Sequence, residues 1–324
     1  CMNTKEKVVV MGHRLPDADS FGAAIGIYRA AKTLNKKAYI VIDNPTSSII
    51  PLMNTFRDNQ DYEADMFVNN HEAKEIMDDN TLLVVVDTNK PSITQCEDLL
   101  YMAKMIVVLD HHRQGSDTIR NSVLSYIEPY ASSASEMVAE ILQYFTEGIR
   151  IRNVEADSIY AGIMIDTDNF MQKTGVRTFE AAAFLRRCGA DVTRVRKLFR
   201  EDMNDYKARG ETIRNAELFR GQFAISECPS DYVDSPTVVG AQAANELLNI
   251  VGVKASFVLT EYKGVIYISA RAIDEVNVQI IMERMGGGGH LNMAGCQLET
   301  VNMEEEARNL LKSTLTEMQD GGEI

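Results

Sequence analysis

Short apolar runs alternate with helical patterns through the first half of the chain, and this alternation is the strongest constraint on the fold. Apolar residues recur at three- and four-residue steps from Phe21 to Leu34, which predicts a helix capped by Asp19 or Ser20. Strands that alternate with helices form mostly parallel sheets flanked by helices, so we expect an α/β fold. The runs that predict buried strands, each rich in Val or Ile, lie at residues 7–11, 38–42, 82–86 and 105–109.

The second half of the chain has a different texture. The length of 324 residues exceeds what one compact core usually fills, so we expect two domains with a boundary close to residue 200. We assign a first domain to residues 1–190, a helical linker to 191–218 and a smaller domain to 219–324. Helices are predicted at 132–144, 156–165, 179–188, 192–199, 202–218, 241–248 and 304–318, and strands of the second domain at 223–226, 255–261 and 265–270.

Charge and cysteine content exclude several classes of protein. The 33 basic and 47 acidic residues give a formal net charge of −14, which is the wrong sign for gripping long nucleic acid through its phosphates. A small anionic substrate is compatible if metal ions reverse the sign locally. The apolar runs are much shorter than the ~20 residues of a membrane helix. Five scattered cysteines without C-x-x-C spacing argue against a disulfide framework and a zinc ribbon, and fit a reducing cytoplasm.

Potential metal ligands follow several of the predicted strands. The stretch GHRLPDADSFG, at residues 12–22, comes directly after the first one. Ligands of open parallel sheets gather outside the carboxyl ends of the strands, so these side chains are expected to converge. A single Asp there is about as often a helix cap, and a lone His is more often hydrogen-bonded, but four such elements in one domain favour a metal site. The candidates are His13, Asp17 and Asp19 after the first strand, Asp87 after the third, Asp110, His111 and His112 after the fourth, and Asp166 after the apolar stretch AGIMI.

So many buried acids require cations. Removing these carboxylates from water together is costly unless positive charge neutralises them. One metal ion would leave some of the carboxylates without a cation, so the number of acidic residues fits two divalent cations. An oxygen-rich ligand set with a minority of imidazoles suits manganese, with magnesium, cobalt and zinc as alternatives. Two metal ions about 3.5–4 Å apart are a usual device for activating water against phosphorus. The residues therefore predict phosphoester hydrolysis.

At this point the motifs carry a family resemblance. GHRLPDADSFGAA, VVVDTNKPS, LDHHRQG and AGIMIDTDNF resemble, in order, the four motifs of the DHH phosphoesterase superfamily, and VNVQIIMERMGGGGH resembles the glycine-rich signature of its DHH-associated C-terminal domain. DTNKPS, IEPYASSASEMVAEIL and RTFEAAAFLRRCGAD are most similar to the bacterial cyclic-di-AMP phosphodiesterases of the GdpP type. The resemblance implies a DHH catalytic domain, a smaller α/β domain with a mixed sheet, and a homodimer. Because the chain opens with Cys1 before Met2, we expect it to be an excised portion of a longer protein. The resemblance implies that the parent protein is anchored in a membrane and that this portion lies in the cytoplasm.

The resemblance also implies a role for each motif residue. A water shared by two manganese ions would attack phosphorus and open cyclic-di-AMP to the linear product 5′-pApA. His112 would face the scissile phosphate, and Asp110 would orient an imidazole. One ion would be held by His13, Asp17 and Asp87, and the other by Asp19, Asp87, His111 and Asp166, with Asp87 bridging the two.

A run of four glycines marks the second domain. Such a run leaves the backbone free to adopt positive φ and to turn N–H groups toward an anion, although in isolation it reads as a flexible linker. In the family this loop holds the nucleotide distal to the metals. Arg271 offers a planar fork for phosphate or a face for a base, and Lys90 and Arg113 could offset the acidic field of the metal motifs. The expected substrate-binding residues are Arg271, Asn277, Gln279, Gly286, Gly287, Gly288, Gly289 and His290.

Two rival functions stay open. Related DHH proteins degrade short oligoribonucleotides or dephosphorylate pAp with the same metals and the same loop, so the metal motifs do not separate a nanoRNase from a cyclic-dinucleotide phosphodiesterase. A nucleotide receptor that binds without hydrolysis belongs to a different class, and the intact ligand set counts against it. A family II pyrophosphatase shares the metal motifs but lacks a GGGGH loop of this kind.

Overall fold

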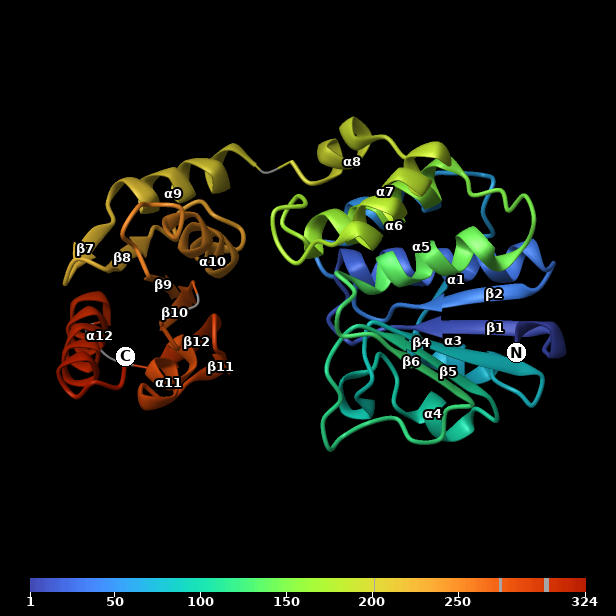
Figure 1. Cartoon of the computed structure of the whole chain (residues 1–324), viewed down its shortest axis with the longest axis horizontal. Coiled ribbons are helices and arrows are strands. Elements are labelled where there is room, and N and C mark those ends of the chain that lie inside the picture. The colour runs from blue at the N-terminus through green and yellow to red at the C-terminus, as the bar shows by residue number, and fades with distance from the viewer. Residues whose placement is uncertain (201, 274–275, 300–302) are drawn as a thin grey trace. The chain divides into compact units, whose positions relative to one another are not determined.

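Two six-stranded sheets, one in each half of the chain, organise the computed structural model (Figure 1). The structure describes residues 1–200, 202–273, 276–299 and 303–324. The chain divides into two units, Cys1–Arg200 and Glu201–Ile324. The expected α/β class, with a parallel sheet in the first unit and a mixed sheet in the second, is confirmed.

All strands of the first sheet run parallel. The chain passes from β1 outward through β2 to β3, and then returns to β4 on the other side of β1, giving the order β3-β2-β1-β4-β5-β6. The strand order therefore reverses between β1 and β4, which is where open parallel sheets bind their ligands. The strands are β1 (Lys7–Met11), β2 (Lys37–Val41), β3 (Phe67–Val68), β4 (Thr81–Val86), β5 (Ile106–Asp110) and β6 (Leu124–Ile127).

Helices cover both faces of this sheet (Figure 1). Successive side chains of a strand point to opposite faces, so Val8 and Val10 pack into one hydrophobic core and Val9 and Met11 into another. The core around Val8 includes α1 (Ala18–Thr33), α2 (Ile50–Arg57), α5 (Ala134–Phe145), α6 (Asn153–Asp166), α7 (Val176–Arg187) and α8 (Val192–Leu198). The core around Val9 includes α3 (Asn70–Ile76) and α4 (Asp98–Met102).

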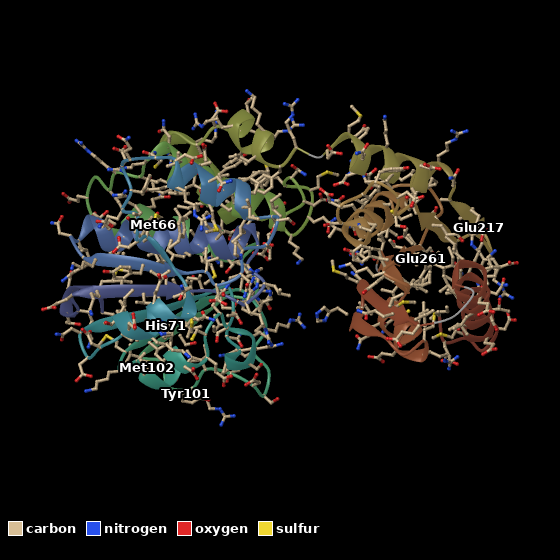
Figure 2. All side chains as sticks on the ribbon, turned by 180° about the vertical axis from the view of Figure 1, so that it is seen from behind. Met66, His71, Tyr101, Met102, Glu217 and Glu261 are labelled. Carbon is tan, nitrogen blue, oxygen red and sulfur yellow. The ribbon has the colours of Figure 1, made fainter. Side chains whose placement is uncertain are left out.

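The short helix α4 has one buried side. Leu99 and Leu100 are buried in the core, whereas Tyr101 and Met102 point outward (Figure 2). Two short 3-10 helices, η1 (Met2–Thr4) and η2 (Pro91–Ile93), complete the first unit. In the described part of the chain, no helix is both long and apolar enough to cross a lipid bilayer.

The second sheet is mixed. Strands β8 and β9 are parallel, and every other neighbouring pair is antiparallel, in the order β11-β12-β10-β9-β8-β7. Two separate cores flank it, one containing Ile281 and Leu311 and the other Ala208 and Ala243. Its strands are β7 (Glu217–Phe219), β8 (Phe223–Cys228), β9 (Ala255–Tyr262), β10 (Val265–Ala272), β11 (Gly288–His290) and β12 (Met293–Leu298), and its helices are α9 (Met203–Arg214), α10 (Pro236–Leu247), α11 (Val278–Arg284) and α12 (Met303–Asp320).

Two local expectations were wrong, and several strands were not predicted. The helix predicted at 202–218 ends at Arg214, because Glu217–Phe219 instead pairs with β8 as an edge strand. The cap of α1 is Asp17, whose Oδ1 accepts from the backbone N–H groups of Asp19 and Ser20. Strands β3, β6, β7, β11 and β12 were not predicted, since none of them contains a run of Val and Ile.

The bounds expected for the two domains and for the helical linker stay predictions. Within residues 191–218, α8 contributes Val195 to a core of the first unit, and α9 contributes Ala208 to a core of the second.

Candidate metal centre

The carboxyl ends of β1, β4 and β5 bring the expected ligands together. His13 Nε2 lies 3.5 Å from Asp17 Oδ2 and 3.3 Å from Asp87 Oδ2. His111 Nε2 lies 3.3 Å from the other oxygen of Asp87, Oδ1. It also lies 3.7 Å from Asp19 Oδ2 and 3.5 Å from Asp166 Oδ2. The six expected ligands form two clusters, His13/Asp17/Asp87 and Asp19/His111/Asp166, with the two oxygens of Asp87 turned to one cluster each. A third, overlapping group joins Asp87 and His111 to His112.

Local backbone geometry positions these side chains. Asp87 directly follows β4 and has a φ of 57°, a left-handed conformation that Asp tolerates better than most residues. Its backbone N–H donates to the carbonyl of Leu109 at the end of β5. The loop that carries His13 is tied down by Gln95, whose side-chain amide donates to the His13 carbonyl and whose backbone N–H donates to Gly12.

The centre has a strongly perturbed electrostatic balance. Burial lowers the pKa of His13, but hydrogen bonding and attraction to Asp17 and Asp87 outweigh it and raise the pKa to about 10. Burial likewise lowers the pKa of His111, while contact with Asp87 and attraction to neighbouring carboxylates raise it to about 9. Burial, as the larger cause, and repulsion from Asp87 raise the pKa of Asp166 to about 6. Without cations, protons on the imidazoles therefore provide the charge that holds the carboxylates together.

The residues fit divalent cations. Asp87 Oδ1 is buried and accepts no hydrogen bond, although an ionised carboxylate can only accept hydrogen bonds and buried acceptors normally have a partner. The other donors of the centre are carboxylate oxygens and imidazole nitrogens, with no cysteine among them. This donor set suits cations that prefer oxygen and nitrogen ligands over sulfur.

Asp110 and His112 form a pair at the edge of the centre. Asp110 is fully buried, and its Oδ1 lies 2.8 Å from His112 Nδ1 and accepts from the His112 backbone N–H. Hydrogen bonding to Asp110 raises the pKa of His112, with burial acting in the opposite direction. The His112 side chain is 55% exposed, so the proton held on Nδ1 leaves Nε2 available to a ligand.

Asn89 is a functional candidate that sequence reasoning missed. Its Nδ2 donates to Asp110 Oδ2 at 2.5 Å and to the carbonyl of His112 at 3.2 Å, and the residue is 2% exposed. Asn89 thus links the loop after β4 to the loop after β5. The sequence does show a polar residue, Asn89, two positions after the predicted ligand Asp87 at the end of a strand. It does not show that Asp110 is the hydrogen-bond partner of Asn89, because that contact depends on the fold.

Replacing Asn89 with alanine should destabilise the protein by about 1–3 kcal/mol, because the buried Oδ2 of Asp110 loses its donor. Urea unfolding of the metal-free protein measures this loss. Asn121→Ala is the control, since Asn121 donates one hydrogen bond to the carbonyl of Leu100 at a partly exposed site, and we expect a smaller loss there. Equal losses for the two variants would contradict the special position of Asn89.

Arg271 in β10 is the most distinctive of the expected substrate residues. Its Nε is buried without a hydrogen-bond partner, and its Nη1 donates to the carbonyl of Ala270. Burial lowers the pKa of the guanidinium. By contrast, Asn277 caps α11 through Gln279 N–H, and the Gln279 side-chain amide donates to Glu283. The side chains of Asn277 and Gln279 are therefore already engaged locally.

The GGGGH stretch is only partly a loop. Gly286 has a φ of 85° and forms the turn after α11, whereas Gly288–His290 is the strand β11, paired with β12. A Cβ at Gly287 would lie 2.2 Å from the carbonyl oxygen of Gly295. A Cβ at Gly289 would lie 2.4 Å from the Cα of Ala294. Close approach to β12 therefore requires glycine at these two positions, and their expected role in anion binding stays a prediction.

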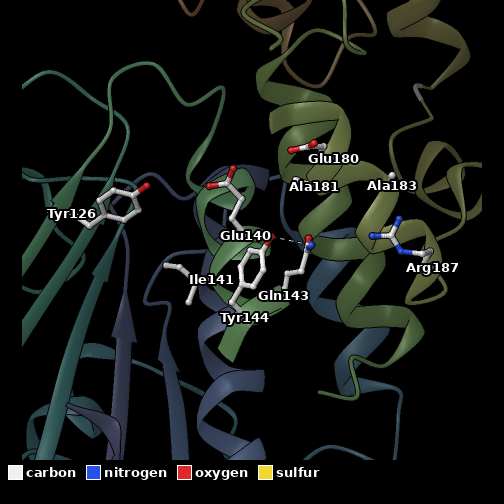
Figure 3. A pocket seen from close by; sticks show the side chains of 9 residues that line it. All are labelled: Tyr126, Glu140, Ile141, Gln143, Tyr144, Glu180, Ala181, Ala183 and Arg187. Carbon is white, nitrogen blue, oxygen red and sulfur yellow. Dashed lines mark hydrogen bonds between the residues drawn. The ribbon is translucent and has the colours of Figure 1, made fainter. Parts of the chain in front are cut away.

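A separate surface pocket lies on the outside of the first unit. It has a volume of about 650 Å³ and lies between β6, α5 and α7, where Figure 3 shows the side chains that line it. The lining mixes aromatic, acidic and basic groups, including Tyr126, Glu140, Tyr144, Glu180 and Arg187, and contains no residue of the metal centre.

Lys90 and Arg113, beside the metal motifs, are exposed.

Comparisons with known proteins agree with the motifs. The sequence models of the DHH family N-terminal domain and of the DHHA1 domain match residues 7–163 and 223–317. The chain is 43% identical, over 97% of its length, to the cyclic-di-AMP phosphodiesterase GdpP of Bacillus subtilis, and covers 48% of that protein. It is 39% identical, over 95% of its length, to the cyclic-di-AMP phosphodiesterase PdeA of Listeria monocytogenes, and covers 47% of it. The chain thus spans about half the length of these relatives.

More distant relatives match this chain over most of their own length. The bifunctional oligoribonuclease and PAP phosphatase NrnA of Thermus thermophilus is 24% identical over 97% of this chain and 91% of its own. Among solved structures, an exopolyphosphatase-related protein from Bacteroides fragilis has the same fold, with a TM-score of 0.80 at 20% identity over 98% of this chain and 94% of its own. With its DHH motifs, its parallel and mixed sheets and these matches, the chain belongs to the DHH family and carries a DHHA1 domain after its DHH domain.

Proposed function

We propose that this chain is a metal-dependent phosphodiesterase that hydrolyses cyclic-di-AMP to 5′-pApA at a two-manganese centre. The observation that carries the proposal is the meeting of six ligand side chains in two clusters that share Asp87. The substrate is inferred from the 43% and 39% identity to cyclic-di-AMP phosphodiesterases.

The metal ligands in this proposal are His13, Asp17, Asp19, Asp87, His111 and Asp166. When bound, two divalent cations would supply an activated water and neutralise the charge that develops on the phosphate oxygens. Asp87 keeps the two clusters at a fixed spacing, since it is 3% exposed and its conformation is set by the end of β4.

His112 and Asp110 are proposed to act on the scissile phosphate. Asp110 holds a proton on Nδ1 of His112 and favours the imidazolium form, as the raised pKa of His112 indicates. The exposed Nε2–H then donates to the phosphate and stabilises the oxygen that leaves when the P–O3′ bond breaks. Asn89 keeps Asp110 in place for this role.

The second unit is proposed to bind the nucleotide through Arg271 and the stretch Gly286 to His290. The support is the unpartnered, buried Nε of Arg271, since a guanidinium with a free N–H suits a phosphate oxygen. The homodimer and the cytoplasmic location stay predictions from the family resemblance.

The proposed activity is tested by incubating the purified chain with Mn²⁺ and comparing hydrolysis of cyclic-di-AMP, cyclic-di-GMP, pApA and pAp. Preferential conversion of cyclic-di-AMP to pApA is expected. Faster cleavage of pApA or pAp would move the protein to the nanoRNase branch. Tight binding of cyclic-di-AMP without turnover would make it a receptor.

Metal-free protein should lose thermal stability as pH rises from about 7 to about 10. His13 and His111 have folded-state pKa values of about 10 and about 9, above the ordinary 6.5, so their stabilising protons are present at low pH and are lost through this window. Mn²⁺ takes over the role of these protons, so the loaded protein should keep its melting temperature over the same range. Differential scanning calorimetry with chelator or with Mn²⁺ measures both curves. His13→Gln should flatten the metal-free curve, and parallel curves with and without Mn²⁺ would contradict the prediction.

A further inference from the structure

We propose that the first turn of α5 holds the carboxylate of Asp19, and that Ser135, Gly22 and Gly162 are positioning residues that set the cation affinity of the Asp19/His111/Asp166 cluster. The inference rests on the proposed function for its consequence, and on hydrogen bonds and close contacts within the first unit for its geometry.

Both oxygens of Asp19 are bound by α5. The backbone N–H of Ala134 donates to Oδ2 at 2.7 Å, and the backbone N–H of Ser135 donates to Oδ1 at 2.8 Å. These are the first two residues of the helix, whose N–H groups have no acceptor within it. A helix N-terminus also favours a negative charge. Asp19 is 1% exposed, so the helix replaces the water that would otherwise solvate the carboxylate.

Ser135 links this turn to α1 by a hydrogen bond. Its Oγ donates to the backbone carbonyl of Asp19 at 3.0 Å, and the residue is fully buried. A Cβ at Gly162 of α6 would lie 2.2 Å from Ser135 Oγ and 2.9 Å from Ser135 Cβ. A Cβ at Gly22 of α1 would lie 2.6 Å from the same Oγ and equally close to the carbonyl oxygen of Ser158 in α6. The first turn of α5 reaches Asp19 because glycine stands on both neighbouring helices.

The remaining polar groups of this turn are satisfied within the segment. Ser133 Oγ accepts from the backbone N–H of Glu136, and Ser132 donates to the Glu136 carboxylate through its hydroxyl and its backbone N–H. Asp19 is therefore the sole described side chain that accepts from the N–H groups of Ala134 and Ser135. The stretch ASSASE, residues 131–136, had no role assigned from the motifs, and in the fold it binds the Asp19 carboxylate.

The consequence falls on one cluster. Asp19 Oδ2 faces His111 Nε2 at 3.7 Å, whereas the cluster of His13, Asp17 and Asp87 has no contact with α5 among the described hydrogen bonds. Displacing the first turn of α5 should therefore weaken cation binding at the Asp19 cluster and spare the other. Changes in groups that orient a metal ligand typically cost 10- to 100-fold in affinity.

The first test titrates the full chain with Mn²⁺ and follows free Mn²⁺ by electron paramagnetic resonance. Two binding steps are expected for the wild type, and Gly162→Ala should weaken one of them on the order of 10-fold or more. Gly26→Ala is the matched control, because a Cβ there would lie 2.3 Å from Val138 Cγ1 of the same helix α5, away from its first turn. Gly26→Ala should leave both steps unchanged. Adding Ser135→Gly to Gly162→Ala removes the two closest atoms, Ser135 Oγ and Cβ, and leaves the Ala18 carbonyl oxygen at 3.0 Å, so it should restore part of the affinity.

Equal weakening of both steps in Gly162→Ala, or the same effect in Gly26→Ala, would overturn the inference. The absence of Mn²⁺ binding by the wild type would instead count against the proposed metal centre.

A second test needs no metal. The amide hydrogens of Ala134 and Ser135 should exchange slowly in the metal-free wild type and in Gly26→Ala, although the first amides of a helix are normally unprotected. In Gly162→Ala they should exchange at least tenfold faster relative to the amides in the middle of α5. Fast exchange of both amides in the wild type would refute the contact with Asp19, whatever the metal titration shows.

Discussion

Replacing Asp87 with asparagine should abolish hydrolysis, with a loss in kcat of about 10³-fold or more. The two oxygens of Asp87 face different clusters, so the neutral amide would weaken both cation sites at once. Charge stabilisation by metal ions is worth several kcal/mol, and about 4 kcal/mol corresponds to a thousandfold change in rate. Asparagine is chosen over alanine because it tolerates the φ of 57° at this position and keeps the shape of the side chain.

Initial rates with Mn²⁺ and the melting temperature of the metal-free protein are measured together. At neutral pH the metal-free variant should lose some thermal stability but stay folded, because asparagine loses the attraction of Asp87 to the protonated imidazoles of His13 and His111, while repulsion of Asp19 and Asp166 is relieved. Asp168→Asn is the matched control, since Asp168 is also an aspartate with positive φ, at 47°, but is exposed and outside both clusters. Undiminished turnover by a folded Asp87→Asn variant would sink the proposed mechanism.

Replacing Glu155 with alanine should destabilise the fold by about 3–5 kcal/mol, because it leaves the mostly buried Arg29 guanidinium without its carboxylate. Glu155 is fully buried and binds Arg29 through both oxygens. It also accepts from the Tyr62 hydroxyl at 3.0 Å and from the backbone N–H of Arg152 at 2.9 Å. The network joins α1 and α6, the two helices that carry Asp19 and Asp166.

Thermal unfolding followed by circular dichroism measures the effect, which should lower the midpoint of the first unit by roughly 6–20 °C. Lys74→Ala is the control, because the Lys74–Asp98 pair is exposed on both sides and such pairs contribute at most about 1 kcal/mol. The midpoint of Glu155→Gln should lie between those of Glu155→Ala and the Lys74→Ala control, since glutamine still accepts a hydrogen bond but carries no charge. A midpoint for Glu155→Ala within the range of the Lys74 control would contradict the prediction.

Much of the first unit was predictable because its signals are local. The Val-rich runs that predicted β1, β2, β4 and β5 correspond to strands within a residue of the expected bounds. The meeting of His13, Asp87 and His111 could be expected as well, since parallel neighbouring strands end at one edge of a sheet. The short strands β3 and β6 escaped prediction because two and four residues carry no readable period.

The helix cap was predicted wrongly because neighbouring residues can serve the same role. Asp17, Asp19 and Ser20 can each cap a helix, and the cap fell to Asp17. That choice left Asp19 in the first turn of α1, with its side chain free to accept from α5. The four glycines could serve a linker, an anion site or a close strand contact, and the approach of β12 at Gly287 and Gly289 is a feature of the folded sheet.

The sequence by itself therefore determined the class of fold, the order of its motifs and the residue types of the metal centre, because periodicity and strand ends are properties of short segments. Only the tertiary structure decided that Asn89 supports Asp110, that Glu155 pairs with Arg29, and that α5 binds an aspartate 115 residues earlier in the chain. Such contacts depend on which side chains lack space or a hydrogen-bond partner once the helices pack, and no local pattern records that.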